Sequence, residues 1–374
     1  MAHKRDRPII VVVGAGIVGS AIAFHLTRRG AQVAVVESFQ PGSGASGHSF
    51  AYLNSFGKEP ESYHDLNRRS MDMWDRFARL LDADVGLRWG GKLRWESTED
   101  GAENLRARVA RLQARGYPCK LLDRDEMLEL EPGLAPDRVT TAAHSEIDGQ
   151  VDPPSVARAC LEKVAEAGST VHLETEATGL LVDGVRVRAV RTASGDLECD
   201  MVVLAAGLGT TALADSAGVY LPQQESPGVV IRTDPRPRLL KTVSVVYAPP
   251  RGSVQSEIHI RQCADGSVMI GEGHQESLAR DDSQEHADGL LDRAVQYLPS
   301  LAGATAIPVP VGYRPMPLDE LPVIGFTEAV PNLYIAVMHS GVTLAPLVGE
   351  WAALEIVEGA RIEALERYRV TRFV

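Results

Sequence analysis

Short apolar runs and amphipathic stretches alternate along the chain. Continuous apolar or β-branched runs are typical of buried strands, and they predict strands at 8–13, 32–36, 201–206 and 333–338. Apolar residues at helical spacing, with caps and glycine terminators, predict helices at 20–29, 62–82, 99–115, 152–168, about 285–298 and about 346–359. The pattern becomes strand-like at 171–191, 229–232, 258–261 and 268–271. Strand–helix units therefore lie at both ends of the chain, and strand-rich segments lie between them.

The first predicted strand leads directly into a glycine motif, Gly14-Ala15-Gly16-Ile17-Val18-Gly19. Gly14 permits a tight turn, Gly16 lets a pyrophosphate approach the backbone, and Gly19 lets the helix pack close to the strand. Unpaired N–H groups at the helix start attract phosphate. Glu37 ends the second strand 18 positions beyond Gly19, where a carboxylate can accept ribose hydroxyls. The motif predicts a dinucleotide site without choosing between NAD and FAD.

The order of these elements predicts an α/β fold with two domains. A Rossmann-like dinucleotide-binding domain is expected to be assembled from the discontinuous segments 1–60, 140–220 and 316–374. The segments 61–139 and 221–315 are expected to form an α+β substrate domain with a mixed β-sheet. The length of 374 residues agrees with two such units at roughly 150 residues per domain.

Composition and charge exclude several classes of protein. Hydrophobic residues make up 44% and charged residues 24%, which is typical of a globular chain. The net charge of −12 and the lack of a basic segment give no reason to expect a nucleic-acid partner. The four cysteines form no CxxC pair, and no histidines have metal-ligand spacing, so no metal is expected. No apolar run reaches about 18 residues, and the N-terminus lacks the apolar core of a signal peptide. We therefore expect a cytoplasmic protein with no membrane-spanning segment.

Six blocks of the sequence resemble the D-amino-acid oxidase (DAO) family of FAD-dependent oxidoreductases. They follow the family's order along the whole chain and read VVVGAGIVGSAIAFHLTRRG, GASGHSFAYLN, VDPPSVARAC, DMVVLAAGLGT, GYRPMPLDELPVIG and NLYIAVMHSGVTLAP. Glycine oxidase, sarcosine oxidase and D-amino-acid dehydrogenases belong to this family. The resemblance implies one FAD in the Rossmann-like domain, with the mixed sheet of the substrate domain over the flavin.

The resemblance also implies which residues contact FAD. The turn after the last strand would direct backbone N–H groups at the pyrimidine end of the flavin, where they stabilise negative charge on the reduced ring. The predicted cofactor contacts are Gly14, Gly16, Ile17, Val18, Gly19, Glu37, Ser38, Ala45, Ser46, Gly47, His48, Ala206, Gly207, Ser340, Gly341, Val342 and Thr343.

Two interpretations of His48 stay open. In relatives similar to dimethylglycine dehydrogenase, a histidine in a block like GASGHSFA is bonded covalently to the flavin. The alternative is a non-covalent contact or an ordinary loop histidine. The linking cysteine of sarcosine oxidase-like proteins corresponds roughly to Gly312, so that linkage is absent here.

The predicted catalytic residues are Arg314, His259 and His339. Family members similar to this chain place an arginine at Arg314 to bind a substrate carboxylate, which its planar guanidinium meets with two hydrogen bonds. The alternative is a structural ion pair with Asp319 or Glu320. His259 replaces a substrate-binding tyrosine of glycine oxidase-like proteins, and Arg261 on the same strand face is a second possible carboxylate partner.

Smaller features bear on the same pocket. His339 follows Met338, where many relatives have Gly-His. Three tyrosines are candidates for the pocket wall or for ordinary packing: Tyr52, Tyr247 and Tyr313.

These residues imply an FAD-dependent enzyme that oxidises the C–N bond of a small amine or amino acid, such as a D-amino acid, glycine, sarcosine or an N-substituted amino acid. Hydride transfer to flavin N5 would give an imine that hydrolyses, and oxygen or another acceptor would reoxidise the flavin. Two alternatives are a flavoprotein component of a hetero-oligomeric amine or opine dehydrogenase and a non-catalytic flavin-binding protein. A homo-oligomer is also possible.

Overall fold

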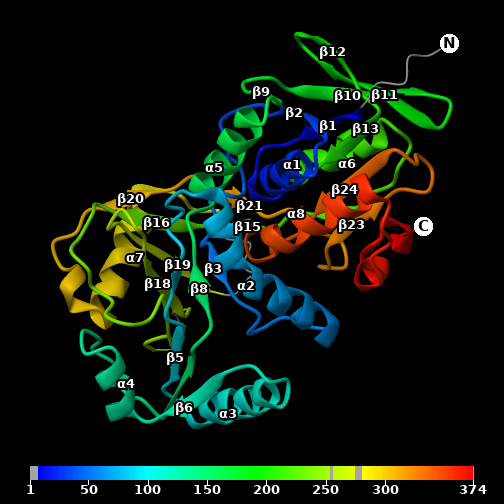
Figure 1. Cartoon of the computed structure of the whole chain (residues 1–374). Coiled ribbons are helices and arrows are strands. Elements are labelled where there is room, and N and C mark those ends of the chain that lie inside the picture. The colour runs from blue at the N-terminus through cyan, green and yellow to red at the C-terminus, as the bar shows by residue number, and fades with distance from the viewer. Residues whose placement is uncertain (1–6, 253–255, 274–279, 374) are drawn as a thin grey trace.

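The structure is a computed structural model that describes residues 7–252, 256–273 and 280–373. The basic start of the chain, on which part of the localisation prediction rests, lies outside these ranges in residues 1–6. Two large sheets organise the described chain (Figure 1). We call the sheet with strand order β23-β24-β13-β1-β2-β9 the first sheet, and the sheet with order β20-β16-β19-β18-β17-β5-β7-β6 the second sheet.

The first sheet contains the predicted βαβ unit. Neighbouring strands pair in parallel, except that β23 runs antiparallel to β24. Its strands are β1 (Ile9–Val13), β2 (Gln32–Val36), β9 (Thr170–His172), β13 (Met201–Leu204), β23 (Val323–Phe326) and β24 (Leu333–Val337). The helices packed on it and on one another include α1 (Ile17–Arg28), α2 (Glu61–Leu81), α5 (Pro153–Glu166) and α8 (Gly341–Glu358).

Alternate residues of β1 face opposite sides of the first sheet, because successive side chains of a strand alternate. Ile10 and Val12 pack into the helix layer. Val11 and Val13 pack on the other face, toward the antiparallel sheet of β10 (Ala177–Asp183), β11 (Arg186–Thr192) and β12 (Gly195–Glu198). The central strand is fully covered, as its continuous apolar run predicts.

The second sheet is mixed, since β17 and β5 pair in parallel among antiparallel neighbours. Its strands are β5 (Lys92–Glu96), β6 (Cys119–Leu122), β7 (Thr141–Ser145), β16 (Val230–Thr233), β17 (Val245–Ala248), β18 (Ile258–Gln262), β19 (Val268–Glu272) and β20 (Ala306–Pro308). Helix α7 (Gln284–Tyr297) packs on one face. Helices α3 (Glu99–Ala114) and α4 (Arg124–Leu130) lie beside β6.

Small elements join these layers. Short strands form three further small sheets. In the first, β8 (Gly149–Gln150) lies between β3 (Tyr52–Leu53) and β4 (Arg88–Trp89). The other two pair β14 (Gln223–Gln224) with β22 (Met316–Pro317) and β15 (Pro227–Gly228) with β21 (Gly312–Tyr313). The remaining helical pieces are α6 (Thr210–Asp215) and the 3-10 turns Gly207–Gly209, Pro299–Leu301, Glu363–Tyr368 and Val370–Phe373.

The predicted start of the last long helix is wrong. The sequence predicts that the last long helix starts near Pro346, but α8 begins at Gly341 and contains Pro346 near its start. Proline removes one backbone hydrogen bond and crowds the preceding turn, which costs least near a helix N-terminus. The turn predicted at 339–341 is therefore the start of the helix.

Two observations bear on the predicted domain boundaries. Strand β7 lies within the predicted segment 140–220, yet it pairs with β5 and β6 of the second sheet. Helix α2 lies within 61–139, yet Trp74 and Phe77 pack in the helix layer of the first sheet. The boundaries themselves stay a prediction.

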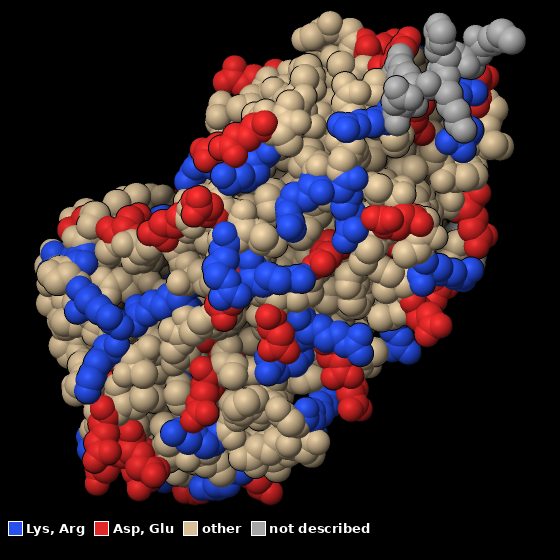
Figure 2. Space-filling model, viewed as in Figure 1, with Lys and Arg blue, Asp and Glu red and all other residues tan. Residues whose placement is uncertain are grey.

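No helix of the described residues is both long and apolar enough to cross a bilayer. On the face in Figure 2, basic and acidic side chains are interspersed rather than gathered into one basic block.

Candidate active site

A cavity of about 1400 Å³ is lined by residues of both large sheets. It brings together segments that lie far apart in the sequence, from the first glycine turn to the start of α8. Gly19 and Gly47 are not among its lining residues in the described chain. The predicted site residues that line it are Gly14, Gly16, Ile17, Val18, Glu37, Ser38, Ala45, Ser46, His48, Ala206, Gly207, His259, Arg314, His339, Ser340, Gly341, Val342 and Thr343.

The glycine turn at the start of α1 requires its glycines for steric reasons. Gly14 has φ +103°, and a Cβ there would lie 2.5 Å from the Ala205 carbonyl oxygen. A Cβ at Gly19 would lie 2.0 Å from the Gly14 carbonyl oxygen, so α1 can approach β1 only with glycine here. At Gly16 a Cβ would meet only the Ser46 hydroxyl, at 3.4 Å. This backbone is open on the cavity side.

Glu37 is held at the end of β2 by the turn it faces. Its Oε2 accepts the Ala15 N–H at 2.7 Å, and its Oε1 accepts the Phe39 N–H at 2.9 Å. The carboxylate therefore has a fixed orientation beside the first turn of α1. That helix has no side-chain cap at Gly16, and Ser46 Oγ accepts the Ile17 N–H at 3.1 Å.

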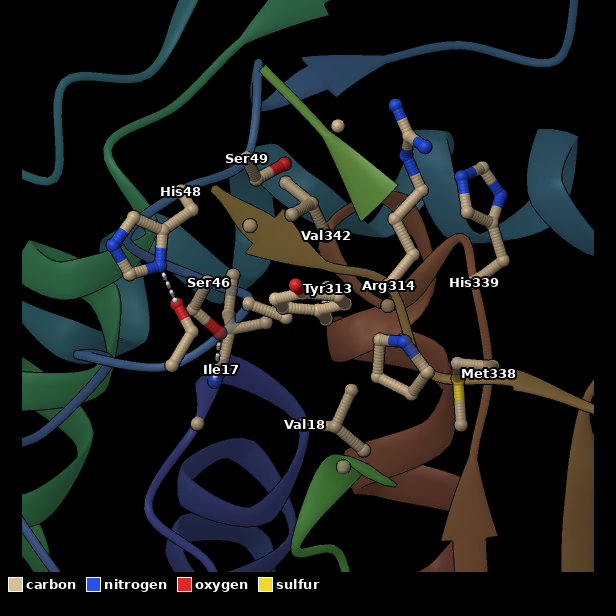
Figure 3. Close-up of a pocket in the computed structure, with 18 of the residues that line it drawn as sticks. Ile17, Val18, Ser46, His48, Ser49, Tyr313, Arg314, Met338, His339 and Val342 are labelled. Carbon is tan, nitrogen blue, oxygen red and sulfur yellow. Dashed lines mark hydrogen bonds between the residues drawn. The ribbon is translucent and has the colours of Figure 1, made fainter. Parts of the chain in front are cut away.

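His48 lies on the same loop as Ser46. Its Nδ1 is 3.0 Å from the Gly44 carbonyl oxygen, and Figure 3 shows it beside Ser46, across the view from Arg314 and His339. A Cβ at Gly312 would lie 2.5 Å from the His48 Cβ. Glycine at 312, where sarcosine oxidase-like proteins have their linking cysteine, therefore provides room for this histidine.

The turn at the start of α8 is held in place by α2. Ser70 Oγ and Trp74 Nε1 donate to the Thr343 carbonyl oxygen at 2.7 and 3.1 Å, and the Tyr63 hydroxyl donates to Ser340 Oγ at 2.8 Å. Ser340 provides no side-chain cap to the helix. The first turn of α8 is therefore rigid, and it lines the cavity.

Arg314 and His339 lie next to each other on one side of the cavity (Figure 3). Arg314 donates to the Pro227 carbonyl oxygen and, at 3.3 Å, to Ser226 Oγ. Of the two acids named in the structural alternative for Arg314, Asp319 pairs with Arg372 at 2.7 Å, which disfavours this acid as the partner.

Lys58 is a cavity residue that the sequence did not single out. Burial lowers the pKa of His339 well below its usual range, and the charges of Lys58 and Arg314 lower it further. Burial also lowers the pKa of Lys58 to about 8. The charges of two cavity cations, Lys58 and Arg314, therefore both act on a neutral His339, an arrangement suited to binding a carboxylate.

The second sheet has one apolar face and one polar face. Leu93, Val246 and Ile260 pack toward α7. The neighbouring residue along each strand points to the opposite face. On that face, the strand register aligns Arg94, Tyr247, His259 and Gly271 in one cross-strand row. All four line the cavity.

His259 belongs to a charged cluster on this polar face. Its Nε2 lies 3.0 Å from Glu257 Oε1, and Arg94 binds the other oxygen of Glu257 at 2.9 Å. The imidazole stacks on Tyr247 with ring centroids 3.9 Å apart. Burial lowers the pKa of His259, and Glu257 opposes that shift.

Other predicted wall residues divide into two groups. Tyr52, Tyr247 and Tyr313 line the cavity. Arg261 does not: its guanidinium donates to Gln150 Oε1 at 2.9 Å and is almost fully buried. This contact disfavours Arg261 as a second carboxylate partner.

Sequence reasoning misses Lys92 and Arg94, because no motif contains them. They alternate with Leu93 and Trp95 on β5, and this alternation of charged and apolar residues is the signal that could have revealed them. No group of three or more His, Cys, Asp or Glu in the described residues could hold a metal ion.

Comparison with known proteins assigns the fold and the cofactor. A family model described as DAO, FAD dependent oxidoreductase, matches residues 10–354. The chain belongs to this family. Glycine oxidase of Geobacillus kaustophilus (strain HTA426) is 28% identical over 360 residues, covering 93% of this chain and 92% of that protein. One of the opine oxidase subunits of Rhizobium meliloti is 25% identical, covering 97% of each.

The fold comparison agrees with the family assignment. The crystal structure of glycine oxidase from Geobacillus kaustophilus superposes with a TM-score of 0.87 and 26% identity, over 98% of this chain and 99% of that one. The DAO-family chain is thus an FAD-dependent amine or amino-acid oxidoreductase with an FAD domain and a substrate domain, as expected.

The residues present fit FAD. The open backbone at Gly16, the start of α1, to which Gly16 contributes no side-chain cap, and the fixed carboxylate of Glu37 all line one cavity. These are the features that a pyrophosphate and a ribose require.

Proposed function

We propose that this protein oxidises the C–N bond of a small amine or amino acid that carries a carboxylate. The observation that supports the proposal is that Arg314 lies beside His339 in the cavity, near the start of α8, and that the charge of Lys58, another cavity residue, acts on the same imidazole. A guanidinium and an ammonium at one place bind a carboxylate and fix the attached α-carbon. A bound flavin would supply, at N5, the acceptor for the hydride of this carbon.

The cofactor contacts follow the geometry of the cavity. Gly14, Gly16, Ile17 and Val18 would face the pyrophosphate, and Glu37, with Ser38 beside it, would hold the ribose. Ala45, Ser46, His48, Ala206 and Gly207 would border the cofactor along its length. Backbone N–H groups of 340–343 would meet the pyrimidine end of the ring. Gly19 and Gly47 would act through packing.

Chain residues supply binding and proton handling. Arg314 and Lys58 hold the carboxylate, and the neutral imidazole of His339 adds no charge between them. His259, in contact with Glu257, can accept the proton that the substrate ammonium must lose before oxidation. Loss of a hydride and of the nitrogen-bound proton leaves an imine, which water hydrolyses to a carbonyl compound and an amine or ammonia.

One experiment tests the proposed function. Purified protein with bound FAD is mixed anaerobically with D- and L-amino acids, N-methyl amino acids and opines. Bleaching of the oxidised flavin by carboxylated amines, but not by their decarboxylated counterparts, is the expected result. A flavin that stays oxidised with every amine would support the non-catalytic alternative.

The electron acceptor and the assembly are separate questions. Peroxide release with and without an artificial acceptor distinguishes oxygen from another acceptor.

Full-length similarity to an opine oxidase component favours a second candidate, in which the protein is one component of a hetero-oligomeric dehydrogenase. Co-purification with an iron–sulfur partner tests this candidate. A homo-oligomer is tested by the mass in solution. Yellow colour in acid-precipitated protein would indicate the covalent link at His48.

A further inference from the structure

We propose that the cavity contains a second anion subsite centred on Lys92, and therefore that the substrate is an amine carrying two carboxylates. This inference deepens the proposed function and rests on it. The first carboxylate would lie at Arg314 and Lys58, and the second at Lys92.

Lys92 is a buried cation without a counter-charge in contact. Its side chain is 5% exposed and lines the cavity. Within residues 7–252, 256–273 and 280–373 it makes no hydrogen bond or ion pair. Its Nζ lies over aromatic rings instead, 3.6 Å from the Phe56 centroid, 4.4 Å from that of Tyr247 and 5.7 Å from that of Tyr52. Ring faces attract a cation but do not neutralise it.

The acids nearest to this ammonium already have other partners. Glu257 binds Arg94 and His259. The Asp148 carboxylate accepts hydrogen bonds from the hydroxyls of Tyr52 and Tyr117. An isolated charge out of water is costly unless it is paired, and a ligand carboxylate is the partner that this position lacks.

A second cation is directed at the same aromatic ring. The Arg108 guanidinium lies 5.9 Å from the Phe56 centroid and lines the cavity, and no ion pair to it is formed among the described residues. Burial and Arg94 lower the pKa of Lys92 to about 7, against the opposing charges of Asp148 and Glu257. A carboxylate placed between Lys92 and Arg108 would hold the lysine in its charged form.

The two anion subsites belong to different parts of the fold. Lys92 extends from β5 of the second sheet, whereas Arg314 follows β21 and lies beside His339. One ligand can occupy both only if a spacer joins two carboxylates. In an imino diacid the reacting C–N bond lies within that spacer, and an acidic amino acid has the same pair of anions around a primary amine.

Binding of non-oxidisable ligands to the FAD-loaded protein tests the subsite. Glutarate and pentanoate differ only by the second carboxylate, and adipate and pimelate vary the spacing. Dissociation constants come from the perturbed visible spectrum of the bound flavin and from calorimetry. We expect the best diacid to bind at least about tenfold more tightly than its monoacid, the scale of one charged contact.

Variants assign that preference to Lys92. Lys92→Met should abolish the diacid preference and leave monoacid binding within about twofold, while Lys92→Arg should retain most of it. Arg108→Met, at an exposed position, should reduce the preference without affecting the fold. Lys120→Met is the matched control, because Lys120 lies in the same sheet, is 54% exposed and pairs with Glu146.

Turnover separates this inference from the proposed function. Iminodiacetate is compared with N-ethylglycine, and glutamate with 2-aminobutyrate, by anaerobic bleaching of the flavin. Lys92-dependent diacid binding without bleaching by any amine would support the subsite and refute amine oxidation. Bleaching by monocarboxylated amines with no diacid preference, or an equal preference in Lys92→Met, would overturn the subsite and leave the oxidation intact.

Discussion

The helix layer behind the first sheet and the polar face of the second sheet both bury ionisable side chains, but the polar face also buries a lysine, Lys92, that has no ion-pair partner among the described residues. In the helix layer, the Glu355 carboxylate accepts hydrogen bonds from the Tyr334 hydroxyl and the Arg369 guanidinium, at 2.9 Å each. His25 stacks on Phe77 there, and burial lowers its pKa to about 3. On the second sheet, Lys92 is buried among aromatic rings, and no carboxylate of the described residues forms an ion pair with it.

The difference indicates which side of the molecule meets a charged ligand. A region that exists only for stability pairs its buried charges or keeps them neutral. A buried cation without a counter-charge lowers the stability of the folded protein. We therefore expect such a cation where a bound anion supplies the counter-charge. Among the described residues, Lys92 on the cavity face of the second sheet satisfies this description, whereas Glu355 and His25 of the helix layer do not.

The largest effect is expected at the glycine turn of the first sheet. Gly14→Ala places a Cβ 2.5 Å from the Ala205 carbonyl oxygen and forces an alanine to φ +103°, so the variant should lose FAD entirely. Absorbance of bound flavin per protein measures this. Gly289→Ala is the control, since a Cβ there meets nothing within 4 Å, and it should keep its flavin. Full flavin content in Gly14→Ala would contradict the steric argument.

Arg314→Ala tests whether a cation of the cavity binds the substrate carboxylate. We expect binding of carboxylated amines to weaken by roughly 2–5 kcal/mol, because a buried charged contact is lost. Steady-state affinity and anaerobic flavin reduction measure the change, with Arg186→Ala, at an exposed position of β11, as the matched control. Unchanged apparent affinity would remove Arg314 from the site.

Replacing His25 tests whether the helix layer keeps its buried ionisable groups neutral. Its pKa of about 3 in the folded state lies below the ordinary value of about 6.5, so the unfolded chain takes up the proton first. Stability is then lost as pH falls from about 6.5 toward 3, by about 1.4 kcal/mol per pH unit. Urea unfolding at pH 7 and pH 4 should show a loss about 3 kcal/mol larger in the wild type than in His25→Phe. Equal losses would mean that His25 is not held neutral.

The smallest of these effects is expected for Glu37→Gln. The amide can replace one of the two acceptor oxygens that bind Ala15 and Phe39, so the fold should survive. FAD affinity should fall by about 1–3 kcal/mol, the cost of a lost charged hydrogen bond. Reconstitution of the apoprotein with FAD measures this, and an unchanged dissociation constant would exclude Glu37 from the ribose site.

The residues around the cavity differ in how far the sequence predicts them. The glycine turn and Glu37 lie within about thirty residues of one βαβ unit, so their spacing alone predicts a dinucleotide site. Arg314 and His339 come from resemblance. Lys92 escapes sequence reasoning because its position depends on strand pairing between distant segments, such as Arg94 opposite Tyr247. Lys58 escapes it because it lies in the loop between β3 and α2. The early start of α8 escapes it as well, because proline usually marks a helix boundary and Pro346 here lies inside the helix.

The central claim is that a carboxylated amine is oxidised in this cavity, and anaerobic mixing of the FAD-loaded protein with matched amines tests it most directly. The account predicts rapid loss of the oxidised flavin spectrum with a carboxylated amine, slower or no loss with its decarboxylated counterpart, and a large further loss of rate in Arg314→Ala. A protein that takes up no FAD, or whose flavin stays yellow with the whole panel, would contradict it.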